Sequence, residues 1–492
     1  MKVMMLKPVI HTALALAVAA ALGACTTVGP DFSAPKGIED AAFRHAGAAP
    51  ANEAAHLPAS WWTVFGDATL DQLETRALRD NPDVRAAAQR LVQAQAQLGV
   101  TRAGQLPAVG VSAGISNSRT SAETSQGLAL GHRAIEGNNY SVGANFSWEL
   151  DLWGRVRRVV EAADAQALAA QDDRDGVLLM LSSQVATAYW QLRGLDADSA
   201  ILTNALATRR ESQELIEARF NAGLSNELDV ARARIERANA ESDLEEVQRQ
   251  RNNLEHALAV LVGVSPTQAL LPAVRDASVL PLPPGIPVGL PASLLGQRPD
   301  LASSVATLKA FNAQVGVAEG AFYPALSLTG NFGFASESLS DIGKGSARQF
   351  SAGPLALSLP LFDAGRNRAN LKLAQARYDE AVANHEARLL TALREVEDAL
   401  SDVQQRQKQG DVQQQAQVAA ARALLVAQAR YERGVSTYLD VTDAQRSTLA
   451  ADRAAAQIRT QRLVAAVSVA RALGGGWSQG APLATIAQAG GQ

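Results

Sequence analysis

Residues 140–158 read YSVGANFSWELDLWGRVRR, and the periodicity of the chain changes within them. Every second residue from Tyr140 to Leu152 is apolar or aromatic, whereas small, polar or acidic residues occupy the positions between. A period of two predicts a β-strand of about 13 residues with two different faces. From Gly154 onward the apolar residues recur with a helical period for about 65 residues. A long strand is therefore expected to lead directly into a very long helix.

The same junction occurs a second time. Residues 350–370 read FSAGPLALSLPLFDAGRNRAN, where a strand pattern again leads through Gly-Arg into a helical pattern. Gly154-Arg155 and Gly365-Arg366 are 211 positions apart. Further matching pairs are Asn81-Pro82-Asp83 with Arg298-Pro299-Asp300, and Arg219-Phe220-Asn221-Ala222-Gly223 with Arg430-Tyr431-Glu432-Arg433-Gly434. These matches indicate an internal two-fold sequence repeat.

The repeat sets the expected domain boundaries. Each copy is predicted to contain a helix, a strand, a polar tip, a second strand, a long helix, a tight turn and a return helix. The expected segments are a lipoprotein signal peptide (1–24), a lipid-anchored linker (25–66), a first repeat (67–262; hairpin about 108–153, long helices 155–262), a Pro-rich linker (263–291), a second repeat (292–473; hairpin about 325–362, long helices 366–473) and a flexible C-terminal tail (474–492).

The four predicted strands each have one apolar face and one face of small or polar residues. In the second copy, for example, Leu326, Leu328 and Phe332 alternate with Ser327, Thr329 and Asn331. This pattern fits the wall of a transmembrane barrel with lipid outside and water inside. Four strands cannot close a barrel, and open sheet edges do not occur in lipid. A homotrimer that supplies 12 strands is the simplest arrangement consistent with an even strand number.

The two long helices are expected at about 155–220 and 366–431, and each could extend on the order of 100 Å. Helices of this length need coiled-coil packing, and apolar residues do recur at steps of three and four, as at Leu389, Leu393, Val396 and Leu400. Gly410, within a Gln-rich run, is expected to interrupt the second helix. The predicted fold is mainly α-helical with a transmembrane β portion.

The N-terminus carries a secretion signal. Lys2 and Lys7 precede an apolar run that is too short for a membrane-spanning helix. The run ends in Leu22-Gly23-Ala24-Cys25, which resembles the bacterial lipoprotein signal, and Cys25 is the single cysteine of the chain. We therefore expect a diacylglyceryl group on Cys25 as the first mature residue, with Trp61-Trp62 as a packing anchor at the end of the linker.

No pattern in the sequence indicates an enzyme. The net charge is −4, so there is no basic surface for nucleic acid. Gly110-Val111-Ser112-Ala113-Gly114 has the spacing of a nucleophile elbow, but Ser112 falls in the middle of a predicted strand and not at a strand-to-helix turn. The six histidines are scattered without metal-ligand spacing, and only Met180 remains after removal of the leader. No cofactor or metal is expected apart from the covalent lipid on Cys25.

Two tight turns are expected to end the long helices. Gly223 and Gly434 can take positive φ without steric cost, and Asn226-x-x-Asp229 and Thr437-x-x-Asp440 can cap the helices that follow. The turns, with Ser225 and Ser436, are expected to be exposed and to form a contact surface for a partner. Leu439, Asp443 and Arg446 lie at i, i+4 and i+7, so they form one stripe along the last helix.

The chain resembles the outer-membrane efflux proteins, the TolC-like outer-membrane factors, and most closely their lipoprotein branch. Features that match in order along nearly the whole mature chain are Cys25, Trp61-Trp62, Arg298-Pro299-Asp300, Pro360-Leu361-Phe362-Asp363-Ala364-Gly365-Arg366, Asp443-Ala444-Gln445-Arg446 and Leu473-Gly474-Gly475-Gly476-Trp477. The resemblance implies a trimer with a 12-stranded barrel in the outer membrane and a periplasmic helical tunnel. It also implies a periplasmic adaptor and an inner-membrane pump as partners, and export of drugs or other small molecules.

The resemblance further assigns the stripe on the last helix to a pore gate. Leu439 would form a constriction, Asp443 an acidic ring, and Arg446 a tether of the closed state. Asp440 would either join the acidic ring or cap the helix, and Asp443 could be only an exposed partner of Arg446. Three alternatives remain open from sequence: an outlet for heavy-metal efflux, an outlet of a protein-secretion system with the same fold, and a coiled-coil lipoprotein without a pore.

Overall fold

A computed structural model describes residues 27–35, 43–45, 57–272, 280–286 and 294–477. The predicted signal peptide (1–24) and the predicted lipid site Cys25 lie outside the described residues. The chain divides into two compact units. Of the described residues, one unit contains 27–35, Leu91–Ala170 and Ser304–Asn384, and the other contains 43–45, 57–90, 171–272, 280–286, 294–303 and 385–477.

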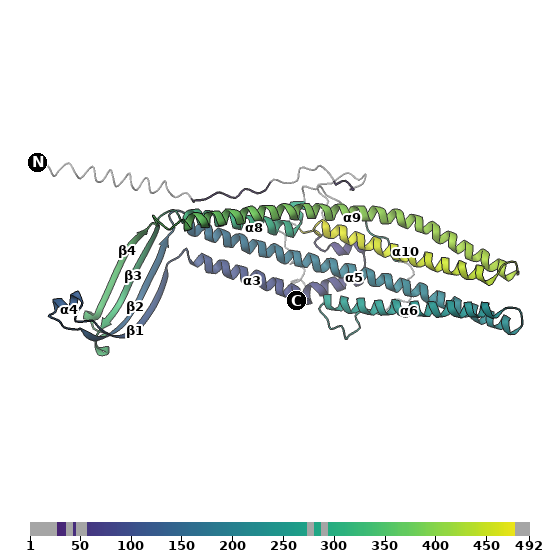
Figure 1. The fold of residues 1–492 in the computed structure, drawn as a ribbon, viewed down its shortest axis with the longest axis horizontal. Helices are drawn as coiled ribbons and strands as arrows, with labels where there is room; N and C mark the ends of the chain where they lie inside the picture. The colour runs from purple at the N-terminus through teal and green to yellow at the C-terminus, as the bar shows by residue number, and fades with distance from the viewer. Residues whose placement is uncertain (1–26, 36–42, 46–56, 273–279, 287–293, 478–492) are drawn as a thin grey trace. The chain divides into compact units, whose positions relative to one another are not determined.

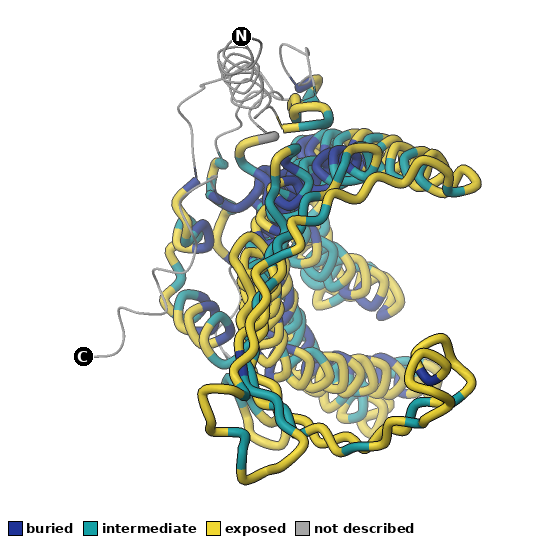
Figure 2. The backbone as a smooth tube through the Cα atoms, turned by 90° about the vertical axis from the view of Figure 1, so that its left-hand side faces the viewer, coloured by how far each residue is buried: buried dark blue, intermediate teal, exposed yellow. Residues whose placement is uncertain are grey.

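The first unit contains a four-stranded antiparallel sheet in the order β1-β2-β3-β4 (Figure 1). Its strands are β1 (Ala108–Arg119), β2 (Glu136–Leu150), β3 (Ala325–Ser336) and β4 (Arg348–Ser358). Most residues of these strands are exposed or half-buried in the single chain, as Figure 2 shows. The predicted hairpins therefore join into one sheet.

The strand register confirms that the sheet has two different faces. Residues directly opposite each other in antiparallel strands point to the same side. One row across the four strands is Val111, Ala144, Phe332 and Phe350, and the adjacent row is Gly110, Asn145, Asn331 and Ser351. Apolar side chains therefore gather on one face, and small or polar side chains on the other.

The limits of the first hairpin differ from the prediction. Strand β2 begins at Glu136 and ends at Leu150, so Leu152 does not continue the alternation. The strand ends there because the Asp151 carboxylate accepts hydrogen bonds from the backbone N–H groups of Val156 (3.0 Å) and Arg157 (2.8 Å) at the start of the next helix. The tip between the strands contains a short helix, α4 (Ser125–Ala129).

The long helices follow the predicted spacing. Helices α5 (Arg155–Asn221) and α9 (Arg366–Glu432) each have 67 residues, and α6 (Glu227–Leu261) and α10 (Tyr438–Ala472) each have 35. Each long helix is one residue longer than predicted. The remaining helices are η1 (Trp61–Phe65), α2 (Ala68–Asp80), α3 (Pro82–Ala103), α7 (Leu294–Gln297), α8 (Pro299–Gly320), η3 (Leu339–Asp341) and η4 (Gly345–Ala347). The internal two-fold sequence repeat stays a prediction.

The expected break at Gly410 is wrong, because α9 passes through it without interruption. A Cβ atom at this position would lie 3.2 Å from Nη1 of Arg462 on α10. The end of the Arg462 side chain therefore lies next to the glycine, between the two helices. Among the described residues, none of the helices has the length and apolar character needed to span a membrane.

The main hydrophobic core of the second unit surrounds Trp61, which is fully buried, and contains Trp190 and Leu258. The Trp61 indole donates to Ser182 Oγ at 3.1 Å, which confirms the predicted packing anchor. Arg251 on α6 is buried as well, and its charge is balanced by Asp196 (2.7 Å) and Glu255 (2.7 Å). This buried charge is therefore accommodated by ion pairs.

The first residues of the predicted flexible tail are packed in the structure. Trp477 is buried and donates from its indole to Asp175 Oδ2 at 3.0 Å. A side chain at Gly476 would collide with the backbone of Leu57 and Pro58. The tail prediction is thus wrong for residues 474–477, where tight contacts require glycine; residues 478–492 lie outside the described part.

In the first unit, the N-terminal segment is held against α5 and α8. Buried Arg158 donates to Val28 O (3.1 Å), Gly29 O (3.0 Å) and Asp31 Oδ1 (2.9 Å). A Cβ atom at Gly29 would collide with the Cα atom of Gly316 on α8. We call residues 27–31 the N-terminal strap; it begins two positions after Cys25.

Candidate gate and turn sites

The turn between α5 and α6 is closed by backbone hydrogen bonds. Gly223 has a φ of +75°, and its N–H donates to Phe220 O at 2.8 Å. The N–H of Leu224 donates to Arg219 O at 2.7 Å, which completes a glycine-centred helix end. The Asn226 side chain then accepts from the N–H of Asp229 at 2.9 Å and caps α6.

The turn between α9 and α10 has the same construction. Gly434 has a φ of +72°, and the N–H of Val435 donates to Arg430 O at 3.0 Å. The Asp440 carboxylate accepts from the N–H (2.9 Å) and the hydroxyl (3.0 Å) of Thr437 in a capping box at the start of α10. Positive φ at both glycines and caps at both helix starts agree with the sequence prediction.

One small core holds the two turns together. Ile216, Val230, Tyr438 and Val441 are buried in it, with the ring of Tyr431 packed against them. The Arg219 guanidinium lies 4.9 Å from the centre of the Tyr431 ring, and such a cation–π contact adds to this packing. The turns therefore form a single end of the second unit, defined here as the double turn, residues 222–226 and 433–437.

The most exposed apolar residues of the double turn were missed by sequence reasoning. Leu224 is 79% exposed and Val435 is 62% exposed, and they occupy equivalent positions of the two turns. The predicted contact residues Ser225 and Ser436 are half-buried and not fully exposed as expected. Their Oγ atoms are buried and have no hydrogen-bond partner. The sequence did contain a signal for these residues: each directly follows a turn glycine. An apolar residue at the tip of a tight turn cannot reach the hydrophobic core, so it is expected to be exposed.

The predicted stripe on α10 lies at the surface of the single chain. Leu439 is exposed, and the side chains of Asp443 and Arg446 are 61% and 53% exposed. Arg446 Nη1 lies 3.5 Å from Asp443 Oδ1, so the two charges are neighbours on one helix. The three predicted residues are therefore available to contact other copies of the chain or the solvent.

Arg446 also connects α10 to α6. Its Nε donates to Glu236 Oε1 at 2.8 Å, and its Nη2 contacts the same oxygen. Glu236 is buried, and its second oxygen lies 3.3 Å from Arg209 Nη2 on α5. The Glu236 carboxylate raises the pKa of Arg446 above its usual value. Sequence reasoning missed Glu236 and Arg209, because neither belongs to a local motif with Arg446.

A second ion-pair cluster connects the same helices. Arg453 on α10 contacts Asp198 on α5 through two hydrogen bonds of 2.8 and 3.0 Å, and it lies 3.2 Å from Asp243 on α6. Hydrogen bonding to Asp198 raises the pKa of Arg453 above its usual value. Together Arg446 and Arg453 join α10 to α5 and α6 through charges that are partly shielded from water.

Ser112 pairs with Gly143 in the middle of the β1–β2 ladder, so it does not lie on the strand-to-helix turn that a nucleophile elbow needs.

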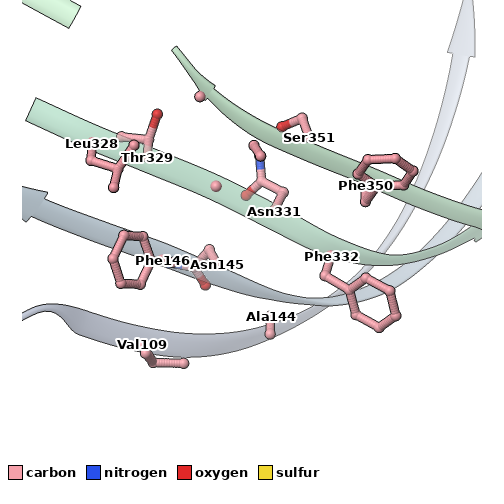
Figure 3. A pocket seen from close by; sticks show the side chains of 13 residues that line it. Val109, Ala144, Asn145, Phe146, Leu328, Thr329, Asn331, Phe332, Phe350 and Ser351 are labelled. Carbon is pink, nitrogen blue, oxygen red and sulfur yellow. The ribbon is translucent and has the colours of Figure 1, made fainter. Parts of the chain in front are cut away.

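The sheet lines a cavity of about 470 Å³, whose wall includes Val109, Phe146, Leu328 and Phe332 (Figure 3). Within the described residues, no group of three or more His, Cys, Asp or Glu side chains could hold a metal ion.

A two-faced antiparallel sheet on very long paired helices is the architecture of an outer-membrane channel. The family model described as "Outer membrane efflux protein" matches residues 73–264 and 290–475, and the chain belongs to this family. The predicted fold class is thereby confirmed. The chain is an outer-membrane efflux channel and not an enzyme.

Individual relatives match over nearly the whole chain. Outer membrane protein OprJ of Pseudomonas aeruginosa is 36% identical over 474 residues, which cover 95% of this chain and 96% of OprJ. Cation efflux system protein CusC of Escherichia coli O6:H1 is 32% identical over 421 residues, covering 86% and 89% of the two chains. The CmeC outer membrane channel of Campylobacter jejuni superposes with a TM-score of 0.87 at 27% identity, over 93% of this chain and 97% of CmeC.

Proposed function

We propose that the protein is the passive exit duct of a tripartite efflux system and that it carries small molecules such as drugs or other toxic compounds across the outer membrane. The observation that carries this proposal is the register of the sheet. An apolar face opposite a face of small and polar residues suits a wall between lipid and a water-filled pore. A stalk without a pore would not need such strands.

The functional unit in this proposal is a homotrimer. Within the described residues, the outer edges of β1 and β4 have no strand partner. Open edges are not tolerated in lipid, and three copies would pair β4 of one chain with β1 of the next to give 12 strands. A lipid on Cys25 would add an anchor, and the strap at residues 27–31 supports its placement close to the start of α5.

We further propose that Leu439, Asp443 and Arg446 form the gate. Three copies of the stripe around one axis would make a Leu constriction and an acidic ring, and the bond from Arg446 to Glu236 would stabilise the closed state. Opening then requires partner contacts that are stronger in the open state. Asp440 is assigned to capping of α10, since its carboxylate is bound to Thr437.

The double turn is proposed as the contact surface for the periplasmic adaptor, which in turn recruits an inner-membrane pump. Two exposed apolar residues, Leu224 and Val435, support this proposal. Each directly follows a turn glycine, and its backbone N–H is held by a hydrogen bond to the preceding helix. An apolar residue fixed in this way loses little conformational entropy when a partner covers it. Ser225 and Ser436, the residues that follow Leu224 and Val435, would lie at the edge of this contact surface.

A heavy-metal outlet is the second candidate, because the relative CusC is named a cation efflux protein. Small organic molecules are preferred because the mature sequence retains Met180 as its single methionine, so no methionine cluster is available for soft metal ions. An outlet for protein secretion is the third candidate, and the predicted lipid site at Cys25 counts against it.

The proposal is tested in a strain that lacks this chain. Accumulation of a fluorescent dye and sensitivity to a drug panel should rise on deletion and return to normal when wild-type protein is supplied. Ser112→Ala is the matched control and should restore efflux fully, because Ser112 is a ladder residue. Sensitivity confined to silver or copper would favour the metal outlet, and a missing extracellular protein with unchanged drug sensitivity would favour secretion.

A further inference from the structure

A cavity of about 240 Å³ lies among α5, α9 and α10, and no function described above uses it. Its lining on α5 falls on one helical face, which includes Ile201 and Ala205. Leu424 of α9 and Leu449 of α10 complete the apolar part of the wall. All of the lining residues belong to the second unit.

One polar side chain in the wall is incompletely satisfied. Gln445 is 8% exposed, and its amide nitrogen donates to Ser212 Oγ at 3.4 Å. Its carbonyl oxygen, Oε1, is buried and accepts no hydrogen bond. A buried acceptor without a donor is unfavourable, and most buried polar atoms in proteins are paired. The oxygen is closed to water in the observed rotamer, so a donor bound in the cavity reaches it when the Gln445 side chain turns toward the cavity.

Two further polar side chains of the wall, Thr448 and Asp452, can accept hydrogen bonds. The Thr448 hydroxyl lies 2.9 Å from the carbonyl oxygen of Ala444 and 3.2 Å from that of Ala420; its single proton is directed at these carbonyls, so its oxygen can still accept. The Asp452 carboxylate accepts from the neutral amide of Gln417 at 2.9 Å, a contact that does not neutralise its charge. The wall thus offers several acceptors and a negative charge.

The cation in the wall does not balance that charge. Arg209 is buried, and its Nη2 lies 3.3 Å from the Glu236 carboxylate. Its Nη1 donates to the Glu236 carbonyl at 3.0 Å, so two of its nitrogens are already directed at α6. A positively charged ligand would therefore meet Asp452 without displacing an existing ion pair.

We propose that this cavity binds a small organic cation, a protonated primary amine on a short apolar body. An ammonium group has three donors, which match Gln445, Thr448 and Asp452. The apolar body would contact Ile201, Leu424 and Leu449. The volume is below the roughly 300–1,000 Å³ of sites for drug-sized ligands, so a fragment of about ten non-hydrogen atoms fits.

Binding would favour the observed arrangement of the helices. The ligand would touch α5, α9 and α10 at once, and a ligand that binds one arrangement more tightly shifts the equilibrium toward it. The binding step does not depend on the proposed duct function, so a binding experiment can fail or succeed independently of a transport experiment.

The test is calorimetric titration of the mature protein in amphipol with 2-phenylethylammonium, with amphipol alone as the blank. Saturable binding to the wild type is expected. Gln445→Met removes the acceptor with little change of shape, and Asp452→Asn removes the charge; each should weaken binding at least tenfold. The matched control Asp411→Asn removes an exposed charge of α9 outside the cavity and should bind like the wild type.

Three results would overturn the proposal. The first is the absence of saturable binding to the wild type, and the second is equal affinity in Gln445→Met, Asp452→Asn and wild-type protein. The third is equal affinity for the neutral isostere 2-phenylethanol, which would show that charge is not recognised. Circular dichroism and the oligomeric state of each variant establish that it is folded before it is titrated.

Discussion

A buried carboxyl group on α5 makes the stability of the folded protein depend on pH. Asp172 on α5 is 3% exposed, and its Oδ2 has no hydrogen-bond partner. Burial, and then the neighbouring carboxylates of Asp175 and Asp173, raise the pKa of Asp172 to about 7. The folded protein therefore holds a proton here that the unfolded chain releases at a lower pH.

This raised pKa predicts a stability that falls with pH. The free energy of unfolding should decrease as the pH rises from about 4, the usual pKa of Asp, through about 7, because the folded state binds more protons in this window. Asp172→Asn should flatten that part of the profile in thermal unfolding followed by circular dichroism. Asp164→Asn, an exposed position of the same helix, is the control. A steeper profile in Asp172→Asn than in the control would contradict the account.

The N-terminal strap depends on another single position. Gly316→Leu should displace residues 27–31, because even a Cβ at Gly316 would lie 3.0 Å from Arg158 Nε, the group that holds the strap. Overpacking of this kind costs about 1–3 kcal/mol, so amide exchange at Val28 should accelerate about 10- to 100-fold. The Val28 N–H normally donates to Trp153 O at 2.9 Å. Gly99→Leu has open space around it and should leave exchange unchanged.

For single residues, the sequence predicted those features that depend on partners a few positions away in the chain. Positive φ at Gly223 and the capping box at Thr437 could be predicted because the partners lie within a few residues. The partners of Arg446 and Arg453 could not be predicted, since Glu236 and Asp198 are brought in by the packing of distant helices. The break expected at Gly410 was wrong because a single glycine does not end a helix that is packed along its length, and α9 continues through it.

At the scale of elements, periodicity predicted the strands and helices well, and their ends less well. The alternation in β2 predicted the face of each residue, which the register confirms. The end of β2 could not be predicted from alternation alone, because Asp151 fits the strand pattern but caps α5 instead. The long helices end within one residue of the prediction, since glycine turns mark those ends in the sequence.

The two faces of β2 should respond differently to a charge. Phe146→Arg places a charge on the apolar face and should cost roughly 2–4 kcal/mol of membrane insertion if the position lies near the bilayer midplane. The adjacent Asn145→Arg points to the other face and should assemble normally. Heat-modifiable migration of the trimer on gels measures assembly. Normal assembly of Phe146→Arg with failure of Asn145→Arg would show that the faces are reversed.

At the scale of the whole molecule, the double turn makes a prediction about assembly with partners. A photo-crosslinking residue at Leu224 or Val435 should capture an adaptor in cells, because these side chains are exposed. The same residue at Val260, which is also exposed but lies at the other end of α6, is the control. Capture at Val260 with none at Leu224 and Val435 would contradict the assignment of the double turn.

A pore closed by the stripe on α10 can be detected directly as the conductance of the purified protein in a planar bilayer. Wild-type protein should conduct weakly at rest. Leu439→Gly and Asp443→Ala should each raise the resting conductance, and Asp443→Ala should also lower the preference for cations, because it removes an acidic ring. Asp411→Ala removes an exposed charge from α9 and should conduct like the wild type. Wild-type conductance and selectivity in both stripe variants would contradict the account.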